Sequence, residues 1–109
     1  LLFPKWTFGD GEADLTALRV SVGGKKNGAT VEHRFELLDR YDAKTGLRSM
    51  SRTTAFPAAI MARALLFDSF GIGPGVHAPE MLAKKAGLVE HMLAELKTRG
   101  VMSTISRAP

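Results

Sequence analysis

One arginine set among hydroxyl side chains is the part of the sequence best suited to bind a ligand. Arg52 lies among Ser49, Ser51, Thr53 and Thr54. Pro57 follows, and because proline is tolerated in the first turn of a helix, it predicts a helix start at about Thr54 or Phe56. Such a start offers free N–H groups and the positive end of the helix dipole. We therefore predict a carboxylate or phosphate cradle in which Arg52, Ser49, Thr53 and Thr54 bind the substrate.

A structural ion pair is the alternative for Arg52. Asp39 and Asp42 precede it across a predicted turn, and either carboxylate suits a guanidinium. The residues alone leave the ligand cradle and the ion pair equally open.

The sequence identifies no catalytic residue. It contains no Walker loop, no HExxH and no nucleophile elbow, and the glycines of GIGPG follow a predicted helix where a dinucleotide loop follows a strand. His33, His77 and His91 share no ligand spacing and there is no cysteine, so we expect no metal site. His77, in a glycine-rich loop, is kept as a candidate for proton transfer.

The elements that position these residues predict an α+β fold. Residues 14–22 and 30–41 alternate apolar and polar side chains around the turn GGKKNG, which indicates an antiparallel hairpin with Leu18, Val20 and Phe35 on its apolar face. Short strands at 47–50 and 101–105 would complete an antiparallel or mixed sheet.

Two main helices and one short helix are expected to pack on this sheet. The first runs from Pro57 to Phe70, is apolar nearly all round, and should end at Gly71. A short helix follows at 79–85. The second main helix, 88–99, carries its apolar residues at helical spacing and should cover the first helix or the sheet edge.

Composition narrows the functional classes. The 109 residues carry a formal net charge of +4, but the basic residues are scattered and no aromatic platform lies among them, so we expect no nucleic-acid partner. No apolar run approaches the roughly 18 residues of a membrane span, and we expect no membrane partner. The absence of cysteine fits a reducing, cytoplasmic compartment.

The amino end suggests that the chain is part of a longer protein. It begins LLFPKW without an initiator methionine, and residues 1–12 are predicted to form a connecting segment of one partial domain, 1–109. Leu1, Leu2, Phe3 and Trp6 form an apolar cluster with no periodic partner, so we expect the chain to self-associate.

A longer motif resembles a known family. LLDRYDAKTGLRSMSRTTAFPAA, residues 37–59, resembles the carboxyl-terminal part of saccharopine dehydrogenase-like proteins, a group that includes saccharopine reductases and lysine 6-dehydrogenases. PGVHAPEML is similar to the family's GVLPPE segment, and LVEHMLAELKTRGV to its last helix and strand, so the resemblance covers about residues 14–101. The family usually has alanine in place of Ser51 and glycine in place of Ala55. The methyl group of Ala55 narrows the mouth of the predicted cradle.

The resemblance implies an NAD(P)-dependent amino-acid oxidoreductase. In such enzymes an amino-terminal Rossmann domain, absent here, holds NAD or NADP, and a second α+β domain binds substrate and forms the homodimer. By resemblance this chain is that second domain, inactive alone, with Arg52 facing an amino-acid or diacid substrate. A non-catalytic interaction module of the same fold is the alternative, and nucleic-acid binding ranks far behind.

Overall fold

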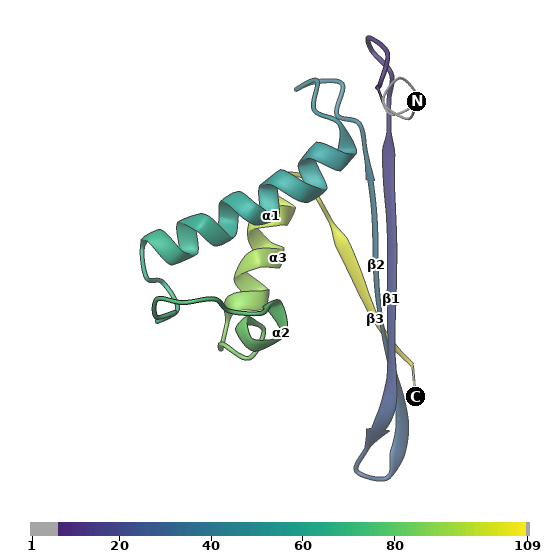
Figure 1. Cartoon of the computed structure of the whole chain (residues 1–109). Coiled ribbons are helices and arrows are strands. Elements are labelled where there is room, and N and C mark those ends of the chain that lie inside the picture. The colour runs from purple at the N-terminus through teal and green to yellow at the C-terminus, as the bar shows by residue number, and fades with distance from the viewer. Residues whose placement is uncertain (1–6, 109) are drawn as a thin grey trace.

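The computed structural model describes residues 7–108 and has the expected α+β architecture (Figure 1). A three-stranded antiparallel sheet has the order β1-β2-β3 and three helices lie to one side of it. The elements, in chain order, are β1 (Leu15–Lys26), β2 (Ala29–Arg40), α1 (Ser49–Leu66), α2 (Pro79–Leu82), α3 (Leu88–Thr98) and β3 (Ser103–Ala108). The apolar cluster of residues 1–6 lies outside the described residues.

The hairpin of β1 and β2 confirms the predicted alternation. Asn27 and Gly28 form a two-residue turn with φ values of 52° and 81°, which matches the right-handed twist of the strands that it joins. Val20 lies opposite Phe35, as the pattern requires. The strands continue farther toward the turn than predicted, because Gly23 and Gly24 pair within the ladder instead of forming the turn.

The remaining strands differ from the prediction. Residues 47–50 form no strand: Leu47 makes an isolated bridge with Asp42, and Ser49 already begins α1. The last strand lies at Ser103–Ala108 rather than 101–105, and it pairs with β2 from Glu32 to Leu37.

The start and end of α1 were also predicted wrongly. The helix begins at Ser49, so Pro57 lies in its interior, where it removes one helical hydrogen bond. The early start is stabilised by a carboxylate from a distant segment, described below. The helix ends at Leu66 rather than Phe70, because Asp68 takes a left-handed conformation with φ of 48° before Gly71 is reached.

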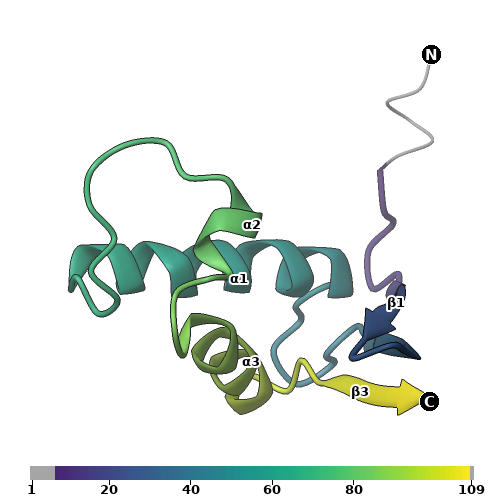
Figure 2. The same cartoon turned by 90° about the horizontal axis from the view of Figure 1, so that it is seen from below.

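The helices pack against each other more than against the sheet. Only the first part of α1 meets β1 and β2, and the rest extends away from the sheet, with α3 packed beneath it (Figures 1 and 2). The short α2 begins at Pro79 as expected but ends at Leu82, three residues before the predicted end. The buried apolar residues of the described chain are few: Ile60 and Ala64 of α1, Leu88 of α3, and Val101 after it.

One face of the sheet is apolar and uncovered. Leu18, Val20 and Val22 of β1, Phe35 of β2 and Ile105 of β3 share this face by register, and all five are exposed large hydrophobic residues. The opposite face carries the exposed ion pairs Arg19–Glu36 and Arg34–Glu32. The molecule is accordingly extended: its radius of gyration is 17.1 Å, against about 13 Å for a compact domain of this length.

Candidate functional site

Arg52 is the centre of a buried polar network. Its side chain lies in the first turns of α1 and the residue is only 7% exposed. Nε and Nη2 donate to the two carboxylate oxygens of Asp39, each at 3.2 Å, which is a bidentate pair. Nη1 donates to Asp42 at 3.2 Å, and Nη2 also donates to the carbonyl of Arg99 at 3.2 Å.

This network uses four of the five N–H donors of the guanidinium. The ring of Phe56 lies 5.8 Å from the guanidinium carbon, and Gly100 lies beside it. A Cβ at Gly100 would stand 3.4 Å from Nη2 of Arg52, and Gly100 has φ of 76°, so two separate constraints favour glycine there. A substrate carboxylate could grip Arg52 with two bonds only by displacing Asp39 or Asp42.

The start of α1 is also satisfied from within the chain. The carboxylate of Asp14 accepts the backbone N–H of Ser49 at 2.6 Å and that of Met50 at 2.9 Å. The Ser49 hydroxyl donates to Thr16 Oγ1 at 2.9 Å and the Thr53 hydroxyl to the carbonyl of Ser49 at 2.9 Å. The first turn of the helix therefore already holds an anion, which is the Asp14 carboxylate.

The structure thus brings together Arg52, Ser49 and Thr53 as predicted, but each has a partner inside the fold. Thr54 is exposed and makes no hydrogen bond through its side chain among residues 7–108. The ion pair with Asp39 and Asp42, left open by the sequence, is present. Substrate binding by Arg52 and its neighbours stays a prediction. Asp14, Thr16 and the Arg99 carbonyl were not predicted as neighbours of this site, since nothing in the local sequence pattern connects them to residue 52.

Two carboxylates around this helix start have lowered pKa values. Partial burial acts to raise the pKa of Asp14, but hydrogen bonds from the backbone of Met50 and Ser49, and the charge of Arg48, outweigh it. The pKa of Asp42 is lowered chiefly by the hydroxyl of Thr45 and the backbone N–H of Lys44, with a contribution from the Arg52 charge. Both groups therefore favour the folded state when ionised.

The stability of the chain should consequently fall in acid. A carboxylate whose pKa is lower in the folded state contributes its full stabilisation above the unfolded pKa of about 3.9, and loses it as the pH falls through the folded value. We expect Asp14→Asn to lower the melting temperature at pH 6 and to flatten its decline between pH 5 and pH 2. Differential scanning calorimetry measures both. Asp68→Asn, at an exposed position, is the control and should retain the wild-type decline; an identical acid profile in Asp14→Asn would contradict the assignment.

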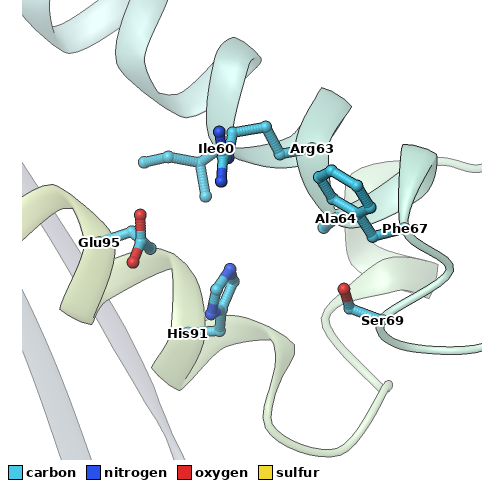
Figure 3. Close-up of a pocket in the computed structure, with 7 residues that line it drawn as sticks. All are labelled: Ile60, Arg63, Ala64, Phe67, Ser69, His91 and Glu95. Atoms are coloured by element: carbon cyan, nitrogen blue, oxygen red, sulfur yellow. The ribbon is translucent and has the colours of Figure 1, made fainter.

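A second cluster of polar side chains surrounds a small cavity between α1 and α3 (Figure 3). The cavity has a volume of about 120 Å³ and its walls include Ile60 and Ala64. Arg63, Ser69 and His91 line it as well, and none of the three makes a side-chain hydrogen bond or ion pair within residues 7–108. Its remaining lining residues are Phe67 and Glu95.

The electrostatic balance of this cavity is positive. Glu95 accepts a hydrogen bond from Arg99 at 2.7 Å, which lowers its pKa most, and the charges of His91 and Arg63 lower it further. Glu95 is thus ionised and already paired. An arginine, an imidazole and a hydroxyl around a cavity of this size suit a single small anionic group.

His77, the candidate for proton transfer, lies elsewhere. Its Nε2 is 2.8 Å from the carbonyl oxygen of Gly73, and the residue is exposed in the loop beside the carboxyl-terminal half of α1. No other titratable side chain lines the apolar cavity of Met61, Leu65, Ile72 and Leu82 next to it. The structure gives His77 no partner with which to exchange a proton within the described chain.

Residues 7–108 show neither a metal-binding cluster nor a membrane-spanning helix. No group of three or more potential metal-ligating side chains lies together there. No helix in this part of the chain has the length and apolar character needed to cross a membrane.

Comparison with known protein families gives a match over most of the chain. The model of the saccharopine dehydrogenase C-terminal domain matches residues 1–101. No solved structure matches the chain. The family match covers the whole segment in which the Arg52 network, the helix start and the cavity between α1 and α3 are built.

Proposed function

Because this chain belongs to the saccharopine dehydrogenase C-terminal domain family, we propose that it is the substrate-side and dimerisation domain of an NAD(P)-dependent amino-acid oxidoreductase. The nicotinamide nucleotide would be held by a separate Rossmann domain, because the described residues contain no glycine-rich strand-to-helix turn. The domain would contribute binding surfaces, and hydride transfer would need the other domain.

The uncovered apolar face of the sheet carries this proposal. The chain exposes 8571 Å² of accessible surface, whereas a compact monomer of this size exposes roughly 5,900 Å². The excess is larger than the roughly 800 Å² that each partner buries in a standard protein interface. An apolar face of this kind marks an interaction surface.

The face has two candidate partners that follow from the proposal, namely a second copy of the chain and the nucleotide-binding domain. Both would contact the apolar side chains Leu18 and Val20 of β1. For the isolated chain only the second copy is available, so self-association is the measurable consequence.

We expect the 109-residue chain to form dimers at tens of micromolar, and Leu18→Lys to weaken them at least tenfold. Leu18 is 55% exposed on the apolar face, and a lysine there would have to be desolvated in the interface. Sedimentation velocity across a concentration series measures the change.

Leu38→Lys is the matched control. Leu38 is 57% exposed, nearly as much as Leu18, but its register places it on the opposite face of the sheet. It should dimerise like the wild type. A wild-type chain that stays monomeric at millimolar concentration, or equal effects of the two lysines, would contradict a dimer through the apolar face.

A further inference from the structure

The outer edge of β1 is long and pairs with no other described strand, and the charged residues along it are Arg19, Lys25 and Lys26. β1 has twelve residues and pairs with β2 alone, and no other described element lies along its outer side (Figure 1). Natural edge strands are usually short, bulged, or carry proline and inward-pointing charges that prevent pairing with another chain. β1 contains no proline, and every residue from Leu15 to Lys26 pairs with one residue of β2, so there is no bulge.

The other edge is a weaker template. β3 has six residues, and among its described side chains only Ile105 is a large hydrophobic residue; Ser103, Thr104 and Ser106 are polar. β1 offers Leu18, Val20 and Val22 at alternate positions on one face. A partner strand would therefore gain more cross-strand contact at β1.

We propose, as a refinement that rests on the proposed dimerisation role, that β1 pairs antiparallel with β1 of a second copy. The two sheets would then join into one continuous sheet with a two-fold axis at Val20. In this register Val20 lies opposite the partner's Val20, and Leu18 lies opposite the partner's Val22. On this face the three large apolar residues of each strand meet apolar residues, and opposed residues share a face, so the apolar faces of the two copies lie side by side. On the other face Leu15 falls opposite the partner's Lys25.

The neighbouring registers fit less well. Moving the axis to Arg19 places that arginine opposite the partner's Arg19, and directly opposed like charges are destabilising. Moving it to Ser21 places Leu18 opposite the partner's Gly24, which removes a cross-strand contact. A shift that pairs odd with even positions would bring the apolar face of one copy beside the polar face of the other.

The seam is the line along which the two β1 strands would pair, and the charges at its ends fit the register with the axis at Val20. Lys26 falls opposite the partner's Asp14, and Arg19 falls opposite the partner's Ser21. The Asp14 carboxylate already accepts hydrogen bonds from the backbone of Ser49 and Met50 and lies near the charge of Arg48, so an attraction to the partner's Lys26 would only add to these contacts. The seam is therefore complementary to itself, as a two-fold interface must be.

Single cysteines test the register directly, because the chain contains no cysteine of its own. Directly opposed Cβ atoms in an antiparallel pair lie about 4.5–5.5 Å apart, close to the span of a disulfide. The two Ser21 positions would be offset by two residues, about 7–8 Å apart, and the two Leu18 positions by four residues, roughly 13 Å apart. Under mild oxidation Val20→Cys should form a disulfide-linked dimer in most molecules. Leu18→Cys and Ser21→Cys should not, but an equimolar mixture of Leu18→Cys and Val22→Cys should cross-link.

The outcomes separate the edge pairing from dimerisation as such. Sedimentation of each reduced variant shows whether it dimerises, and circular dichroism shows whether it is folded. A folded, dimeric Val20→Cys that gives no disulfide overturns the edge pairing and leaves the dimerisation role intact. If Ser21→Cys by itself, or Leu18→Cys by itself, cross-links as efficiently as Val20→Cys, the proposed register is wrong. If the wild-type chain and all reduced variants sediment as monomers, both the dimerisation role and the edge pairing are refuted.

Discussion

Arg52→Met should destabilise the isolated chain by about 3–5 kcal/mol, because it leaves the carboxylate of Asp39 buried without a counter-charge. Asp39 is only 4% exposed, and both of its oxygens accept hydrogen bonds from Arg52. The same change releases Asp42 and the Arg99 carbonyl. Chemical denaturation followed by circular dichroism measures the loss.

Two controls define what the loss means. Arg19→Met removes an exposed ion pair with Glu36 and should cost no more than about 1 kcal/mol. Arg52→Met combined with Asp39→Leu should recover much of the stability, because the unpaired buried charge is gone. A small effect of Arg52→Met, comparable to that of Arg19→Met, would refute the structural role.

The same residue tests the substrate prediction in a longer enzyme. A lysine cannot reproduce the bidentate bonds of a guanidinium. If Arg52 holds the fold, Arg52→Lys should lower the melting temperature and leave the KM of the surviving enzyme unchanged. If it binds a substrate carboxylate, KM should rise roughly ten- to a hundredfold while the melting temperature stays near the wild-type value.

Ile60→Ala should cost about 2–5 kcal/mol, the second large effect that we expect. Ile60 is 1% exposed between α1 and α3, and the apolar core of the described chain contains only three other fully buried side chains. Because so few buried side chains hold the two helices together, truncating Ile60 removes a large share of the apolar contact between them. Urea denaturation gives the free energy of unfolding.

Leu66→Ala is the matched control for Ile60→Ala. Leu66 lies in the same helix but is 77% exposed, so its truncation should change the free energy of unfolding by less than about 0.5 kcal/mol. A loss at Leu66 as large as that at Ile60 would show that the exposed end of α1 is buried in solution, and dimer formation would be the first explanation to test.

The hairpin was predictable because its information is local. The alternation in residues 14–22 and 30–41 predicted the two strands and the residues that share the apolar face, whereas the two-residue turn at Asn27 and Gly28, which places Val20 opposite Phe35, is shorter than the predicted turn GGKKNG. What the alternation does not encode is whether anything covers the apolar face. The same pattern describes a buried face and one that awaits a partner.

The start of α1 was not predictable from the same kind of signal. Pro57 indicated a first turn, but Asp14, which lies 35 residues before Ser49 in the sequence, accepts hydrogen bonds at an earlier start. The partners of Arg52 illustrate the same limit. Asp39 and Asp42 were recognised as candidates, and the choice between them and a ligand depended on burial, which arises only when α1 and the end of β2 meet.

The Arg52 network also joins parts of the chain that leave the ribosome at different times. The β1–β2 hairpin needs only its own two-residue turn and should form within about 1–10 μs. The bond from Arg52 to the Arg99 carbonyl spans 47 residues of sequence, and the entropy of closing so long a loop must be offset by contacts made at the same time. During synthesis the bond to the Arg99 carbonyl can therefore form only after that residue has left the ribosome, later than the pairs of Arg52 with Asp39 and Asp42, which span 13 and 10 residues.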